Sequence, residues 1–173
     1  MIAPKPLLAL VLLVAPAVLG AQAARQSQPA TVTQMLGGTK VTIAYNRPSA
    51  RGRQLFGGIV AWGRVWDPGA DEATTIAFSG DVLVAGQPLA AGTYSLWAIP
   101  QPDEWTVIFS RAAPVFHVPY PGESHDALRV KLKPERGPFV ETLAFYFPVA
   151  IADRALLQLH WGETIVPIPI AVK

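Results

Sequence analysis

The chain has 173 residues, of which 14 are lysine or arginine and 12 are aspartate or glutamate, so its formal net charge is +2. Such a small excess argues against a nucleic-acid-binding surface, which requires basic residues clustered on one face. The absence of cysteine excludes disulfides and cysteine metal sites, so the fold must be stable through burial alone.

The first 23 residues have the pattern of a secretory signal peptide. Lys5 precedes an apolar run over residues 7–19, and the cleavage-site pattern Ala21-Gln22-Ala23 follows it. We expect cleavage after Ala23, because the run is shorter than the ~20 residues of a membrane-spanning helix and Pro16 interrupts it. The protein is therefore expected to be periplasmic or secreted, with no membrane span after cleavage.

The remaining chain is expected to comprise a short tether, residues 24–30, and a single β domain, residues 31–173. Its first elements form a predicted β-hairpin over residues 32–45, because apolar residues alternate after the turn-forming pair Gly37-Gly38. Alternating or β-branched runs predict further strands over residues 73–79, 81–86, 90–100, 105–110, 128–134, 139–147, 154–161 and 164–170.

These runs predict an all-β fold, an antiparallel β-sandwich or flattened barrel of about nine to ten short strands. Trp97, Trp105 and Trp161 lie in the predicted strands and are expected in the core. Pro167 and Pro169 lack backbone donors on the same side of the last strand. We therefore expect that strand to be a solvent-facing sheet edge.

Two segments have no strand pattern. Residues 111–127 form a long loop with two histidines, and loops of this length are often functional. Residues 47–75 form a longer irregular, arginine-rich segment, with one helical turn expected near residues 53–60. It contains an unusual concentration of charged and aromatic side chains, namely Arg47, Arg51, Arg53, Arg64, Trp62, Trp66, Asp67, Asp71 and Glu72.

This charged cluster has two interpretations. The guanidinium groups could bind a carboxylate, phosphate or sulfate, with Trp62 or Trp66 stacking on a sugar ring. Alternatively, the arginines could pair with the three acids and hold the loop on the sheet, while the tryptophans fill one end of the sandwich. The candidate ligand-binding residues are Arg47, Arg51, Arg53, Arg64, Trp62, Trp66, Asp71 and Glu72, with His117 and Tyr120 from the second loop.

Other chemistry has less support. Asp71 and Glu72 are adjacent, so acid-base catalysis of a hydrolytic reaction would require a partner such as Glu104 or Asp126. His117, His125 and His160 have no metal-binding spacing. No catalytic residue, metal or cofactor is therefore predicted.

Five ordered motifs carry a resemblance to a known family. They are SARGRQLFGG at 49–58, VWDPGADEAT at 65–74, LAAGTYSLWAIP at 89–100, EWTVIF at 104–109 and DALRVKLKP at 126–134. In order and spacing they resemble an uncharacterised family of exported bacterial all-β domains, a domain of unknown function. The resemblance implies an exported all-β domain and no established catalytic residues. Asp67 stands where that family commonly has arginine, and residues 116–121 depart from its usual Trp-Gly segment.

The sequence thus favours a non-enzymatic binding or envelope-interaction module for an anionic or sugar-like ligand, the partner being a small molecule or an envelope component. A carboxylate-dependent hydrolase and a purely structural partner domain are the two alternatives.

Overall fold

The computed structural model describes residues 25–173, and the predicted signal peptide lies outside this range. The first strand, β1, begins at Gln28, so the domain starts within the expected tether. In the part of the chain that the structure describes, no helix has the length and apolar character needed to span a membrane.

The described chain forms ten strands and one short 3-10 helix, η1 (Glu123–His125). The strands are β1 (Gln28–Leu36), β2 (Thr39–Arg47), β3 (Thr75–Phe78), β4 (Val82–Val84), β5 (Gln87–Leu89), β6 (Gly92–Ile99), β7 (Trp105–Ser110), β8 (Asp126–Leu132), β9 (Glu135–Ile151) and β10 (Arg154–Val172).

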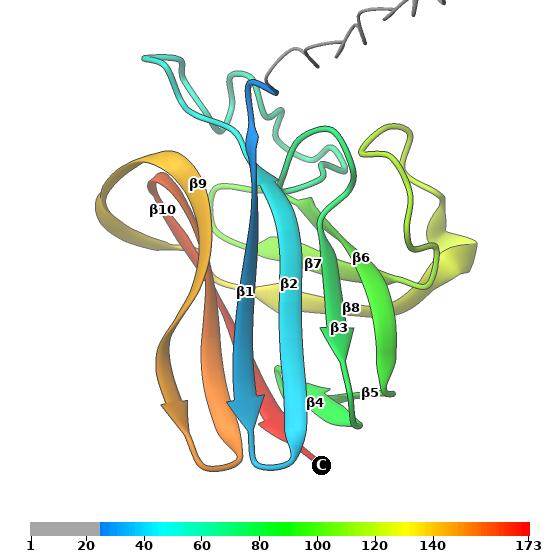
Figure 1. Cartoon of the computed structure of the whole chain (residues 1–173). Coiled ribbons are helices and arrows are strands. Elements are labelled where there is room, and N and C mark those ends of the chain that lie inside the picture. Colours follow the sequence, from blue (N-terminus) through cyan, green and yellow to red (C-terminus); the bar gives the residue numbers. More distant parts are fainter. Residues whose placement is uncertain (1–24) are drawn as a thin grey trace, which may run out of the picture.

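These strands form two antiparallel sheets (Figure 1). The larger sheet has the order β1-β2-β3-β6-β7-β8, and the smaller has the order β5-β4-β10-β9. The prediction of an all-β antiparallel fold is confirmed, and the structure is a sandwich of two open sheets rather than a closed barrel. The first hairpin is also confirmed, since β1 and β2 pair from Leu36↔Thr39 onward around Gly37, whose φ is 53°.

The last two strands are much longer than predicted. The segments expected as separate strands at 154–161 and 164–170 are one strand, β10, with register shifts near His160, Gly162 and Thr164. The N–H of Val172 donates to the carbonyl of Asp153 at 2.7 Å. The end of β10 therefore lies beside its own beginning, and the strand bends back along the sandwich (Figure 1).

The prediction that the proline-containing strand is a solvent-facing edge is wrong. In the smaller sheet β10 lies between β4 and β9. Its last pair with β9 is at Ile165 and its first pair with β4 is at Ile170, so Pro167 and Pro169 lie between the two ladders. The carbonyl of Pro169 still accepts a hydrogen bond from the N–H of Ala85, so an interior strand accommodates both prolines.

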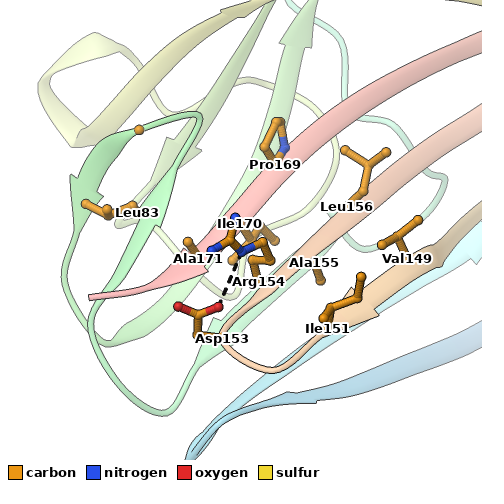
Figure 2. A pocket seen from close by; sticks show the side chains of 11 residues that line it. Leu83, Val149, Ile151, Asp153, Arg154, Ala155, Leu156, Pro169, Ile170 and Ala171 are labelled. Carbon is orange, nitrogen blue, oxygen red and sulfur yellow. Dashed lines mark hydrogen bonds and ion pairs between the residues drawn. The ribbon is translucent and has the colours of Figure 1, made fainter.

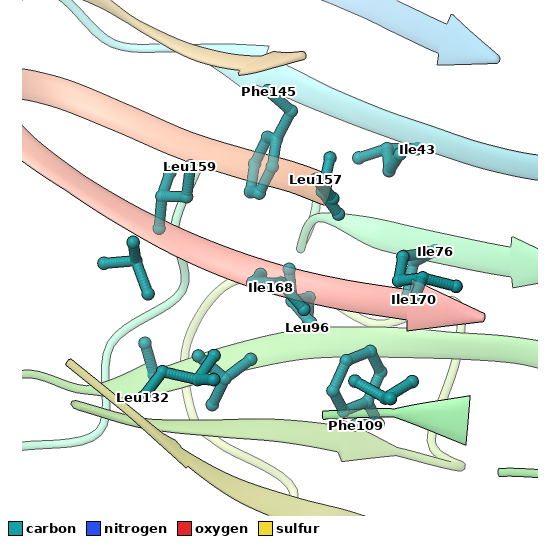
Figure 3. Packing of buried hydrophobic residues seen from close by; sticks show 14 of the residues in the cluster. Ile43, Ile76, Leu96, Phe109, Leu132, Phe145, Leu157, Leu159, Ile168 and Ile170 are labelled. Carbon is teal, nitrogen blue, oxygen red and sulfur yellow. The ribbon is translucent and has the colours of Figure 1, made fainter. Parts of the chain in front are cut away.

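The core lies between the inner faces of the two sheets (Figure 3). Ile43, Leu96 and Phe109 of the larger sheet pack in one cluster with Phe145 and Ile168 of the smaller one. Burial of these side chains is the main stabilising contribution to the fold.

The three strand tryptophans are buried, as predicted. Trp105 and Trp161 belong to the main core, whereas Trp97 packs with Ala73 and Ile108 in a second, smaller cluster. The long 111–127 loop covers this second cluster through Val115 and Tyr120.

Candidate functional site

The irregular segment closes one end of the sandwich, next to the start of β1 (Figure 1). The expected helical turn near residues 53–60 does not form, and this stretch is a series of turns. Leu55 and Val60 insert into the main core. The N–H of Trp66 donates to the carbonyl of Ala98 and the N–H of Ala98 to the carbonyl of Trp66, each at 2.8 Å. Hence the segment is fixed to β6 by backbone pairing as well as by apolar burial.

Glycines allow this tight path. A Cβ on Gly57 would overlap the indole of Trp62, and a Cβ on Gly58 would overlap the backbone carbonyl of Gln54. Gly57 also has φ 76°, a conformation that favours glycine. The FGG end of the first family motif is therefore explained by the close packing of Trp62 and the loop backbone.

Rings of this segment form an aromatic cluster with two strand tryptophans. Phe56 is at its centre, with ring centroids 4.9 Å from Trp105, 5.9 Å from Trp66 and 6.1 Å from Trp62. Trp66 stacks on Trp161, with centroids 6.0 Å apart and planes 10° from parallel. Such pairs add to the stability gained from burying the rings.

Trp62 differs from the other members because 41% of its surface is exposed. It lines two hollows, of about 320 Å³ and about 330 Å³, which also share Glu163 and Thr164. We call this surface the Trp62 groove. Its first hollow lies against Trp105, Glu135 and Arg136, and its second against Arg53, Phe139 and Trp161.

The polar groups of the groove come from both sheets and the loop. Arg136 Nη2 lies 2.8 Å from Glu163 Oε2 in an exposed ion pair. Glu135 takes part in no side-chain hydrogen bond or ion pair formed among residues 25–173. Trp105 is buried, and its Nε1–H has no acceptor among these residues. The first hollow therefore contains a free carboxylate and borders a buried donor that lacks a partner.

Of the residues predicted for a ligand site, Arg53 and Trp62 line the groove and Trp66 supports it from below. The guanidinium of Arg53 donates to the carbonyls of Ala50 and Ser49, at 2.9 and 2.7 Å. Its position is thus fixed by the turn that precedes it.

The other arginines lie outside the groove. Arg47 Nε donates to the carbonyl of Leu143 at 3.0 Å, and Arg51 Nη1 donates to Gln26 Oε1 at 3.1 Å. Arg64 is exposed and forms none of the side-chain bonds within residues 25–173. The interpretation that these arginines pair with Asp67, Asp71 and Glu72 is wrong, because Arg47 binds a carbonyl of β9, Arg51 binds the side chain of Gln26 and Arg64 forms no side-chain bond within residues 25–173.

The predicted acids lie on a different side of the segment. Both oxygens of Glu72 pair with the guanidinium of Arg25. This hydrogen-bonded pair lowers the pKa of Glu72 to about 2. Glu72 also accepts from Asn46 Nδ2 at 3.1 Å. The pair lies over a hollow of about 300 Å³ beside β1 and β2.

Asp71 and His117 meet through the backbone. The carbonyl of Asp71 accepts from the N–H of His117 and also from the ring Nδ1–H. Asp71 has φ 61°, as a turn residue does. The contact joins the two irregular loops.

Tyr120 lies on the far side of the second loop, packed edge-on against Trp97 with centroids 5.3 Å apart. Its hydroxyl donates to Asp126 Oδ1 at 2.5 Å, and Arg129 Nε donates to Asp126 Oδ2 at 2.6 Å. Burial, followed by the bond to Asp126, raises the pKa of Tyr120 to about 12. The predicted residues thus divide among three places rather than forming one site.

The two carboxylates suggested as hydrolytic partners form ion pairs with basic side chains. Glu104 pairs with Lys131 at 2.8 Å, and Asp126 pairs with Arg129. Within residues 25–173, no group of three or more histidine, aspartate or glutamate side chains is arranged to hold a metal ion. These positions offer no support for a paired-carboxylate mechanism at Asp71 and Glu72.

Asp67 is 3% exposed and accepts a hydrogen bond from the N–H of Thr74 at 2.8 Å. Its second oxygen has no partner among the described residues. Burial raises the pKa of Asp67 to about 7, although the Thr74 bond opposes the shift. This aspartate lies directly after Trp66, on the inner side of the segment.

A separate hollow of about 380 Å³ lies near the β9–β10 turn (Figure 2). It is lined mainly by apolar side chains such as Leu83, Val149 and Ile170, with the Asp153–Arg154 pair at its rim. It contains none of the predicted site residues and none of the buried unpartnered polar atoms. The Trp62 groove is therefore the better candidate site.

A sequence model of the family described as "Protein of unknown function (DUF2911)" matches residues 27–170. The chain belongs to this family. No curated protein and no solved structure matches the chain.

The DUF2911 fold also brings residues into the groove that the sequence did not indicate. Glu135, Arg136 and Glu163 are ordinary charged residues of predicted turns and strand ends. They meet because β9 and β10 pair at Thr164↔Arg136 and Ile165↔Glu135. The sequence feature that came closest to indicating the groove was Trp62 in its irregular segment. It indicated an aromatic surface but did not identify the charged residues beside it.

Proposed function

We propose that this DUF2911 domain is an exported binding module that holds a saccharide in the Trp62 groove. The observation that carries the proposal is the partly exposed indole of Trp62 between two hollows bordered by charged side chains. The apolar faces of sugar rings pack on such indoles, whereas their hydroxyl groups require polar partners in the surrounding wall.

The surroundings of Trp62 suit a preorganised surface. Trp62 packs over Gly57 and against Phe56, and Phe56 is itself packed on Trp105 and Trp161. An aromatic side chain held in this way loses little conformational entropy when a ligand binds.

Export is the second part of the proposal, and it rests on the signal-peptide pattern of residues 1–23. It places the domain where cell-envelope saccharides occur. Expression of the full chain, followed by fractionation and N-terminal sequencing, tests this part. A mature chain beginning at Ala24 in the exported fraction is expected, and an intact chain retained in the cytoplasm would contradict it.

Calorimetric titration with cellotetraose, maltotetraose and tetra-N-acetylchitotetraose tests the binding proposal. At least one is expected to bind the wild type, and Trp62→Ala should weaken that binding about fivefold, because stacking on an aromatic ring contributes roughly 1 kcal/mol. Phe116→Ala is the matched control, since Phe116 is 57% exposed and outside the groove. Equal loss in both variants, or no binding to any of the three, would contradict the proposal.

A further inference from the structure

The charges along the Trp62 groove are divided between its two hollows. The Arg136–Glu163 pair cancels internally. Two ionic groups then remain, and they lie in different hollows. Glu135 lines the first hollow and Arg53 lines the second, with Trp62 in the wall that both hollows share.

Neither remaining charge is neutralised by an ion pair within the described chain. Glu135 forms no such pair among residues 25–173, and the guanidinium of Arg53 binds only the neutral carbonyls of Ala50 and Ser49. The groove therefore has a negative end beside Trp105 and a positive end beside Phe139.

Building on the proposed saccharide site, we infer that the ligand is an oligosaccharide whose charges complement those of the groove, with a free amino group on one ring and a carboxylate on another, the two rings being separated by a third. The ammonium lies in the first hollow against Glu135. The carboxylate lies in the second hollow against Arg53, whose planar guanidinium suits a carboxylate. A ring between them packs on Trp62.

The amino end is tested with two probes that differ only at nitrogen. Chitotetraose, at a pH where its amines are protonated, is compared with tetra-N-acetylchitotetraose by calorimetric titration. The wild type is expected to prefer the amine form about two- to fivefold, as the usual strength of an exposed ion pair implies. Glu135→Gln should remove this preference, and the preference should also fall as salt concentration rises.

The carboxylate end is tested with tetragalacturonate and its methyl ester. Arg53→Gln should abolish a preference for the acid, whereas Arg51→Gln, the matched control directed at Gln26, should retain it. Thermal unfolding of each variant checks that the loop remains folded, and Arg53→Lys, which keeps the positive charge, should restore part of the preference.

The outcomes distinguish the charge assignment from saccharide binding itself. Loss of the amine preference in Glu135→Gln, together with loss of the acid preference in Arg53→Gln, supports the charge assignment. Equal affinity of the wild type for charged and neutral probes overturns it while leaving saccharide binding intact. No binding of any of the four probes overturns this inference, and a failure of the three neutral tetrasaccharides separately overturns the proposed function.

Discussion

Gly57 lies directly beneath the indole of Trp62, so that a Cβ on residue 57 would overlap Trp62 Nε1. This contact sets the position of the exposed indole in the groove. It also links the first family motif to the candidate site, because a residue with no side chain is what permits the aromatic wall to form.

Gly57→Ala is therefore expected to displace Trp62 as well as to strain the backbone. Gly52→Ala is the matched control, since Gly52 has φ 69° but open space around its Cβ position. Both variants should lose roughly 1–2 kcal/mol of unfolding free energy through the left-handed conformation, and Gly57→Ala should lose more. Urea unfolding measures the difference, and equal losses would contradict the Trp62 contact.

Asp67 should make the free energy of unfolding depend on pH in an unusual direction. Its pKa is about 7 in the folded protein, against the ordinary value of 3.8. Between these values the unfolded chain has released the proton and the folded protein keeps it. Stability should therefore fall as pH rises from about 4 to 7, by up to ~1.4 kcal/mol per pH unit from this residue.

The isosteric variant Asp67→Asn removes this contribution. It should flatten the pH dependence over that range and raise stability at pH 8, because no buried charge forms. Asp103→Asn, at an exposed carboxyl, is the control. Urea unfolding from pH 4 to 8 checks the prediction, and parallel curves for wild type and Asp67→Asn would show that Asp67 does not hold a proton in the folded state.

Glu72 makes the free energy of unfolding depend on pH in the opposite direction. Its pKa is lowered to about 2 by Arg25, so the pair stabilises the folded chain above the ordinary pKa of 4.5 and is lost as pH falls towards 2. Glu72→Gln should loosen the start of β1 and speed amide exchange at Gln28 and Ala30. The difference from wild type should shrink on acidification, and an unchanged exchange rate at pH 6 would contradict a holding role for the pair.

Two of the arginines predicted for a ligand site should behave differently. Arg47 is bonded to the carbonyl of Leu143 in β9, so Arg47→Ala should cost about 1 kcal/mol of unfolding free energy. Arg64 is exposed in a turn, and Arg64→Ala should change stability by less than about 0.5 kcal/mol. Thermal unfolding of both variants tests the contrast.

The fold was largely predictable from the sequence, because residue alternation reports which face of each strand is buried. The hairpin at Gly37 and the burial of Trp97, Trp105 and Trp161 follow from this local pattern. The role of Pro167 and Pro169 does not, because it depends on where the ladders with β4 and β9 end. Sequence periodicity contains no information on that register.

The candidate site was predictable only in part, for a similar reason. Arg53 and Trp62 were indicated by composition, and both line the groove. Glu135 and Glu163 reach it through the pairing of β9 with β10, a contact between residues far apart in the chain. One interpretation had the arginines paired with acids. Arg53 instead donates to unpaired carbonyls of its own loop, and Arg47 donates to a carbonyl of β9.

The position of saccharide binding is tested most directly by the indole N–H resonances of the five tryptophans in a two-dimensional NMR titration with the best-binding tetrasaccharide. The resonances of Trp62 and Trp105 should shift, because both side chains line the first hollow. The resonance of Trp97, whose Nε1–H donates to Ser95 Oγ in the second cluster, should stay in place. Saturating ligand that leaves Trp62 unshifted, or that moves Trp97 alone, would contradict binding in the Trp62 groove.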